Sequence, residues 1–237
     1  MHSLIIHMPG STERRANVDT LLATLPNAEI VDAVDGRLPE VQAATPIVAG
    51  TLYRPCYPFP LKGGEVGCFL SHRKCWQKIV DEDWDAALIA EDDLAIDPEV
   101  LPALLRLVGR NATPESFIRI PPKDREPLTT VIDREGDLAL FTPRRIGLQT
   151  TAQVVGRIAA KRLLAATETL DRPVDSFLQM HWVSGQPVQT ILPNGARELV
   201  FGGGSTVQQK SGNLPQKLLR EFHRARYRAA VKRHPQT

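Results

Sequence analysis

The sequence has no long hydrophobic run, few aromatic residues and few cysteines. Its apolar runs fall far short of the roughly 20 residues that a membrane-spanning helix needs, and the N-terminal segment is too short for a signal peptide. Three cysteines, an odd number, argue against a disulfide framework and predict a reducing, cytoplasmic setting. Aromatic residues make up only 5% of the chain, so stacking platforms for nucleic acid are scarce.

The charge of the chain is unevenly distributed. From Lys210 onward there are eight lysines and arginines and one acid, Glu221, a local charge of +7, so the total of +2 leaves −5 for residues 1–209. We therefore expect a mildly acidic domain over residues 1–209 and a basic amphipathic C-terminal helix or tail over residues 210–237.

The C-terminal segment has two interpretations. Its apolar residues, Leu218, Phe222, Ala225 and Ala229, share one helical face and its arginines lie elsewhere. Such a helix suits a peripheral position on an anionic membrane surface. It equally suits packing on the domain with a solvated basic side.

Hydrophobic patterning predicts strands that alternate with helices, which is typical of an α/β fold with an open, mostly parallel sheet. The expected strands are 3–8, 29–34, 86–90, 117–120, 138–142, 147–155 and 188–192. The expected helices are 12–25, 65–80, 97–109, 159–170, a short one from 173, and 214–232.

The most informative stretch is the apolar run 86–90 followed directly by Glu91, Asp92 and Asp93. The apolar run predicts a buried central strand, and ligands bind beyond the carboxyl ends of such strands. Three adjacent carboxylates repel one another, and a divalent cation bound to a substrate phosphate would supply the missing positive charge. Taken alone, the triplet also suits a solvated acidic turn.

A second group of residues has metal-binding potential. Cys68, His72 and Cys75 fall on one face of the expected helix 65–80, a spacing compatible with a soft-metal site. Trp76 shares that face, so it is apolar. We therefore favour a buried, hydrogen-bonded histidine over a zinc ligand.

Several linked segments resemble glycosyltransferase family 25, which includes lipooligosaccharide and collagen galactosyltransferases. The resemblance rests on collinear motifs between Leu4 and Gln208: Ile6–Pro9 with Arg14 and Arg15, Ala33–Gly36, Gly64–His72 with Trp76, the acidic triplet, Pro173–Asp175, and Gly204–Gln208.

The resemblance implies a GT-A type fold, a UDP-sugar donor, Mn²⁺ (or Mg²⁺) and inversion at the anomeric carbon. The implied function is transfer of a hexose to a saccharide acceptor on a bacterial surface glycolipid. Galactose is the hexose that the resemblance favours. The implied metal ligands are Asp93 and Glu91, and the implied donor-binding residues are His7, Arg14, Asp35, Glu91 and Asp92.

Asp175 is the candidate base. An inverting displacement needs a group that accepts the proton of the acceptor hydroxyl, and Pro173 places Asp175 in the first turn of a helix. An acid at that position is also favoured by the helix dipole alone. Arg14 has two roles open to it: contact with the donor diphosphate or pairing with a nearby carboxylate.

Two other function classes are compatible with the acidic triplet and the basic tail. A metal-dependent phosphohydrolase or nucleotidyltransferase would need the same acidic triplet. A non-enzymatic module that binds a sugar nucleotide, or nucleic acid through the basic tail, is the other alternative.

Overall fold

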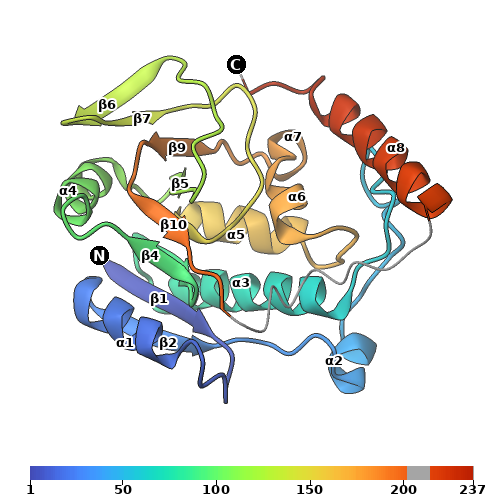
Figure 1. Ribbon diagram of the computed structural model, residues 1–237, viewed down its shortest axis with the longest axis horizontal. Helices are drawn as coiled ribbons and strands as arrows, with labels where there is room; N and C mark the ends of the chain where they lie inside the picture. Colours follow the sequence, from blue (N-terminus) through green and yellow to red (C-terminus); the bar gives the residue numbers. More distant parts are fainter. Residues whose placement is uncertain (202–213, 237) are drawn as a thin grey trace.

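The computed structural model describes residues 1–201 and 214–236, so the expected closing segment Gly204–Gln208 lies outside the described residues. Its main feature is an eight-stranded sheet in the order β2-β1-β3-β8-β5-β9-β7-β6, beside a two-stranded sheet of β10 and β4 (Figure 1). The strands are β1 His2–His7, β2 Ala28–Asp32, β3 Ala86–Glu91, β4 Leu94–Ile96, β5 Phe117–Arg119, β6 Val131–Glu135, β7 Leu138–Phe141, β8 Ala152–Gly156, β9 Gln189–Leu192 and β10 Ala196–Glu198.

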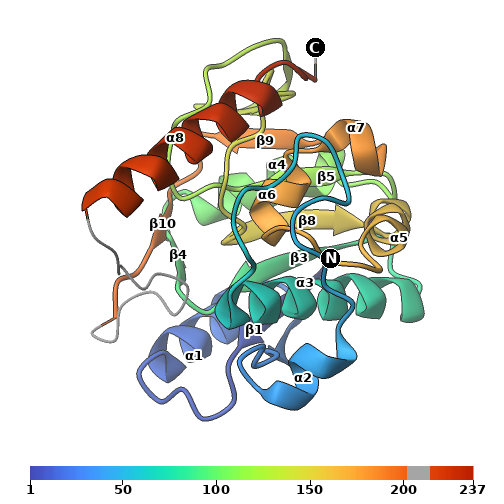
Figure 2. The ribbon, with the colours of Figure 1, turned by 90° about the vertical axis from the view of Figure 1, so that its right-hand side faces the viewer.

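Helices cover both faces of the large sheet (Figures 1 and 2). They are α1 Arg15–Thr24, α2 Pro39–Ala44, α3 Gly63–Asp81, α4 Leu101–Asn111, α5 Arg157–Ala166, α6 Val174–Leu178, α7 His181–Ser184 and α8 Leu214–Val231. The expected GT-A type α/β architecture, an open sheet flanked by helices, is confirmed.

The sheet is mostly parallel in direction. β1 is parallel to β2 and β3, whereas β8 lies antiparallel between β3 and β5. β9 is parallel to β5, and β7 and β6 complete the sheet as an antiparallel pair, so only β8 and β7 oppose the other strands. The carboxyl ends of β1 and β3 are therefore adjacent, and Ile6 lies opposite Glu91.

Two apolar cores sandwich the central strand β3. Ala87 and Ile89 face a core with α3 and α5, while Leu88 and Ala90 face one with α1 and α4. This alternation buries both faces of the strand, as expected for a continuous apolar run at the centre of an α/β sheet. The acidic triplet is thus attached to one of the most rigidly held strands.

Close backbone approach fixes the start of α3. A Cβ on Gly67 would lie 2.4 Å from the carbonyl oxygen of Val34, and one on Gly36 would lie 2.3 Å from the backbone nitrogen of Gly67. Only glycines allow this contact. The contact sets the position of α3, whose next turns carry Cys68 and His72 toward the end of β3.

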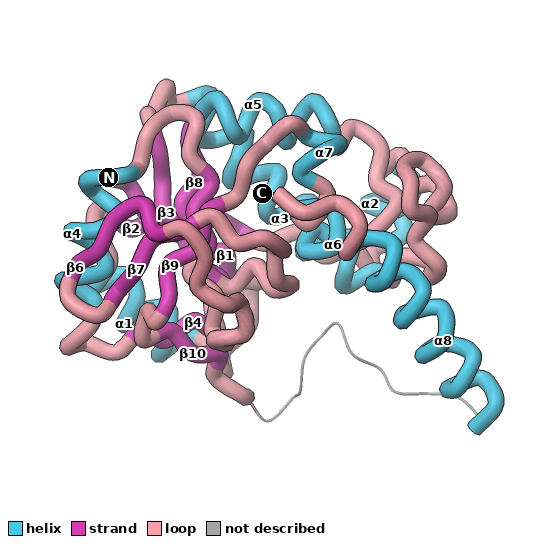
Figure 3. Tube along the Cα trace, turned by 90° about the horizontal axis from the view of Figure 1, so that it is seen from above, coloured by secondary structure: helices cyan, strands magenta, loops and turns pink. Residues whose placement is uncertain are grey.

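The C-terminal helix α8 lies along one edge of the molecule (Figure 3). Its Tyr227 is buried, and Arg172 donates a hydrogen bond of 3.2 Å from Nη1 to the Tyr227 hydroxyl. Beyond the helix, Gln236 bonds to both backbone groups of Val188. Among the described residues, no helix combines the length and apolar character that a membrane crossing requires.

Candidate functional site

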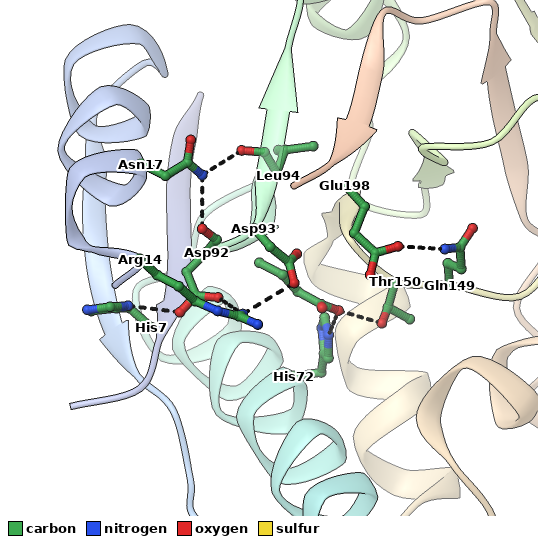
Figure 4. Close-up of polar contacts among 11 residues, drawn as sticks. His7, Arg14, Asn17, His72, Asp92, Asp93, Leu94, Gln149, Thr150 and Glu198 are labelled. Carbon is green, nitrogen blue, oxygen red and sulfur yellow. Dashed lines mark hydrogen bonds and ion pairs between the residues drawn. The ribbon is translucent and has the colours of Figure 1, made fainter. Parts of the chain in front are cut away.

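The acidic triplet forms the turn between β3 and β4. Glu91 ends β3, and Leu94 begins the short strand that pairs with β10. The backbone of the turn is fixed from both sides: Glu91 N donates to Thr151 O at 2.8 Å, and Leu199 N donates to Asp93 O at 2.8 Å. Figure 4 shows Asp92 pointing toward His7 and Arg14, and Asp93 beside Arg14.

Asp92 is held by two of the predicted donor-binding residues. Its Oδ2 lies 2.9 Å from His7 Nδ1, and its Oδ1 accepts a hydrogen bond from Arg14 Nη1. The same guanidinium reaches Asp93 Oδ2 at 3.2 Å. Burial alone would lower the pKa of Arg14, but these carboxylates raise it. Arg14 thus pairs with carboxylates, one of the two roles that the sequence left open.

The carboxylate of Glu91 is held by hydrogen bonds from His72 on α3 and from Thr150 just before β8. His72 Nε2 lies 3.2 Å from Glu91 Oε1, and the Thr150 hydroxyl donates to the same oxygen at 2.7 Å. Gln153 Nε2 lies 2.9 Å from His72 Nδ1, which fixes the plane of the imidazole. Burial opposes ionisation of Glu91, but the bonds from His72 and Thr150 lower its pKa.

Asp93 has one carboxyl oxygen that pairs with Arg14 and one that has no partner among the described residues. Burial, with repulsion from Glu91 and Asp92, raises the pKa of its carboxyl to about 7, although Arg14 acts in the opposite direction. Its Oδ1 is buried and has no hydrogen-bond partner among the described residues. A buried oxygen in this state requires an explanation, and a divalent cation is one that matches its chemistry. The buried, unpartnered oxygen of Asp93 therefore fits the chemistry of a hard metal ion, and the assignment of Asp93 and Glu91 as its ligands stays a prediction.

Asp175 lies in the first turn of α6, as predicted, and faces the same site. Its Oδ1 accepts a hydrogen bond of 2.6 Å from Ser176 N, and its Oδ2 lies 3.5 Å from Gln149 N. Burial raises the pKa of Asp175, and the negative charge of Glu91 raises it further. The structure therefore brings Asp175 within electrostatic range of the triplet, although the two are more than 80 residues apart in sequence.

Sequence reasoning missed one acid of the site. Glu198, on β10, lies beside Asp93 in Figure 4 and contributes to the raised pKa of that carboxyl. Gln149 Nε2 donates to Glu198 Oε2 at 3.2 Å. The three-residue strand β10 gave no detectable periodicity, so only the pairing with β4 reveals this residue.

Asp35 is not among these contacts. Its carboxylate pairs with Arg37, at 2.8 Å from Nε and 2.7 Å from Nη2, and this pairing lowers the pKa of Asp35 to about 2. Its assignment to donor binding stays a prediction.

The predicted soft-metal face is divided in two. Cys75 is buried in the core, whereas Cys68 Sγ, His72 and Glu91 present ligand atoms within 4.8 Å of one another. Burial, with the charges of Glu91 and Asp175, raises the pKa of the Cys68 thiol and keeps it neutral. His72 is fully buried and hydrogen-bonded on both ring nitrogens, which confirms the favoured interpretation.

A hollow of about 250 Å³ lies at the carboxyl ends of β1 and β2. Its lining includes His7, Ser11, Thr12 and Asp32. His7 thus borders the hollow on one side and contacts Asp92 on the other. The position is that of a ligand-binding crevice at the edge of an α/β sheet.

The family model described as glycosyltransferase family 25 (LPS biosynthesis protein) matches residues 1–178. The chain belongs to glycosyltransferase family 25. It is 33% identical to human procollagen galactosyltransferase 2 over 110 residues, which are 44% of this chain and 18% of that protein.

Longer matches connect this family 25 chain to two other animal proteins. It is 30% identical to the bovine "probable inactive glycosyltransferase 25 family member 3" over 73% of this chain and 30% of that protein. It is 29% identical to a glycosyltransferase 25 family member of Drosophila melanogaster over 74% of this chain and 30% of that protein. The chain thus spans at most 30% of these three relatives, so their activities are not transferred with the match.

The contact between Thr150 and Glu91 allows an isosteric test. Thr150→Val removes the hydroxyl that orients Glu91, and loss of such a supporting bond typically weakens metal affinity by about 10–100-fold. We expect a weakening of that size for Mn²⁺, measured by calorimetry. Thr151→Val is the matched control, because Thr151 is buried beside it and its hydroxyl has no hydrogen bond among the described residues. Equal affinities of both variants would assign Thr150 to packing alone.

Proposed function

We propose that this protein is an inverting glycosyltransferase that moves a hexose from a UDP-sugar to a saccharide acceptor. The observation that carries the proposal is the unpartnered, buried Asp93 Oδ1 within an acidic triplet at the edge of a family 25 domain. Mn²⁺ or Mg²⁺ bound by Asp93 and Glu91 would neutralise the leaving diphosphate.

Donor binding is assigned to the carboxyl ends of β1 and β3. His7 borders the hollow of about 250 Å³, which is the proposed place of the nucleoside. Arg14 is half-buried between Asp92 and Asp93, so its guanidinium is close to the proposed position of the diphosphate. Arginine favours such a ligand because its planar donors match phosphate oxygens.

Asp175 is the proposed base. As the acceptor oxygen bonds to the anomeric carbon, the bond from that carbon to the diphosphate breaks and the acceptor proton passes to Asp175. The raised pKa of this carboxylate makes it a better proton acceptor than an exposed aspartate. The backbone bonds from Ser176 and Gln149 hold it in one orientation.

Galactose is the proposed sugar, and a bacterial surface glycolipid the proposed acceptor. Human procollagen galactosyltransferase 2 supports the first by its name, and the LPS biosynthesis description of the family supports the second. This acceptor would place the protein at the cytoplasmic face of the inner membrane, which stays a prediction.

The deciding experiment measures consumption of a panel of UDP-hexoses with Mn²⁺ and with EDTA, and analyses the products formed with a saccharide acceptor. We expect UDP release and a glycosylated acceptor, both dependent on Mn²⁺. Cleavage within the diphosphate would instead support the phosphohydrolase or nucleotidyltransferase alternative. Binding of UDP without turnover would support a binding module, an outcome that the bovine relative named as probably inactive makes relevant.

A further inference from the structure

The helix α8 is attached to the body with its apolar face turned outward. Leu218 and Phe222 are 68% and 62% exposed, whereas Tyr227, nearly half a helical turn away from Phe222 around the axis, is 8% exposed. Ala225 and Ala229 are exposed on the same side as Phe222. A helix of a soluble domain normally buries its apolar stripe, so this arrangement is inverted. We call Leu218, Phe222, Ala225 and Ala229 the outward stripe.

The opposite face explains why the inverted arrangement is held. The Tyr227 ring packs edge-on against Tyr57 at 5.3 Å between centroids, and its hydroxyl accepts the bond from the buried Arg172. Behind the helix, His234 stacks on Trp182 at 4.1 Å. The helix is therefore anchored by aromatic contacts and hydrogen bonds that do not use the outward stripe.

Cationic side chains flank the outward stripe on both sides. Arg226 and Arg233 lie on one side and Arg228 and Lys232 on the other, and none of the four forms an ion pair within the part of the chain that the structure describes. The single acid of the helix, Glu221, pairs with Arg224. An apolar stripe between two rows of unpaired cations matches the profile of an anionic bilayer surface.

A cation-lined pocket opens beside the stripe. It has a volume of about 520 Å³ and lies between α8 and the loop that carries Arg54. Arg54, Arg226 and Arg233 supply its charge, and His223, Pro55 and Tyr227 also line it. Several convergent donors around one cavity suit a phosphate group, because each can give a charge-assisted hydrogen bond.

We propose that α8 docks this protein on an anionic lipid bilayer, with the outward stripe at the interface and a lipid headgroup phosphate in the pocket between Arg54, Arg226 and Arg233. Tyr57 and Tyr227 pack against each other at 5.3 Å between ring centroids, so α8 meets the body at this pair. Burial raises the pKa of both tyrosines and the charge of Asp175 adds to both effects, so the pair lies within electrostatic range of the proposed base. An acceptor held in the bilayer would approach Asp175 from this side. Only this last step rests on the proposed function.

The test measures binding to vesicles of phosphatidylcholine alone and of phosphatidylcholine with phosphatidylglycerol, using the full chain. We expect the protein to bind only the anionic vesicles and to bind them less as salt rises, because salt screens the attraction. Arg226→Glu with Arg233→Glu should weaken binding by at least about 30-fold, since each cation near the surface contributes about 1 kcal/mol. Leu218→Ser with Phe222→Ser should also weaken it.

Matched controls separate this face from general charge and hydrophobicity. Lys123→Glu with Arg125→Glu makes the same charge change at an exposed position, and Leu128→Ser with Ile132→Ser removes exposed apolar residues elsewhere. Both should leave vesicle binding unchanged, and UDP affinity should be normal in all four variants. Equal losses in the controls, or indifference of the intact protein to anionic vesicles at low salt, would overturn the proposal. Binding of inorganic phosphate by a protein that binds no vesicle would identify a soluble phosphate ligand instead and equally overturn it.

Discussion

Asp175→Asn should lower turnover by roughly 10²–10⁴-fold, the usual scale for loss of a general base, with donor affinity nearly unchanged. Asparagine has the same size and keeps an oxygen for the bond from Ser176 N, so the start of α6 should be preserved. What is lost is the ability to accept the proton of the acceptor hydroxyl. The measurement is kcat for transfer, together with the dissociation constant of UDP.

The pH profile gives this prediction a second readout. Because the pKa of Asp175 is raised by burial and by Glu91, the base is protonated at acidic pH and kcat should rise with pH through a value above the ordinary carboxyl range. Asp97→Asn is the matched control, since Asp97 also accepts a backbone bond near a helix start, at 2.9 Å from Glu99 N, but lies outside the site. Near-normal turnover of Asp175→Asn would return Asp175 to a capping role.

The local parts of the site were predictable because they depend on neighbours in sequence. The apolar run before Glu91 has the length and composition of a central strand, and the structure confirms it as β3. Strand β1 was equally legible, and its pairing with β3 places His7 beside Asp92. Two strands that each bury both faces leave little choice of partner or register.

The parts that sequence reasoning missed are those created by tertiary contact. The three-residue strands β4 and β10 exist through their pairing with each other, and without that pairing Glu198 is an ordinary loop acid. Strand β6 contains Asp133, Arg134 and Glu135 and lies at the sheet edge, so it lacks an apolar signature. The roles of Thr150 and Gln153 likewise appear only when β8 lies beside β3.

The C-terminal helix shows a different limit. Its apolar stripe and its basic residues were both evident, but periodicity cannot say which face meets the domain. In the structure, the buried side chain of Tyr227 anchors the helix to the domain, and Leu218 and Phe222 face solvent. The packing interpretation therefore holds for the face that carries Tyr227, and the membrane interpretation stays a prediction for the opposite face.

Asp93→Asn should have opposite effects on stability and on binding. Removing a metal ligand should weaken Mn²⁺ by more than the roughly 10–100-fold that follows loss of a merely supporting residue, and UDP affinity measured with Mn²⁺ should fall with it. In metal-free protein the same change should be stabilising, because it removes one of three mutually repelling carboxylates from a buried position. Asparagine still offers an oxygen to Arg14, so the contact at 3.2 Å can persist.

The sign of the stability effect depends on pH. The pKa of Asp93 is about 7 in the folded protein, above the ordinary value of 3.8, so the folded state holds an extra proton between these values. The contribution of the Asp93 carboxyl to the free energy of unfolding is thus fully present below about pH 4. This contribution is lost as pH rises toward about 7, at up to about 1.4 kcal/mol per pKa unit. Thermal unfolding in EDTA should show Asp93→Asn several degrees more stable than the native protein at pH 8 and nearly equal to it at pH 4.5. A variant that binds Mn²⁺ and UDP normally would remove Asp93 from the metal site, and one destabilised at pH 8 would show that Asp93 is not under repulsion there.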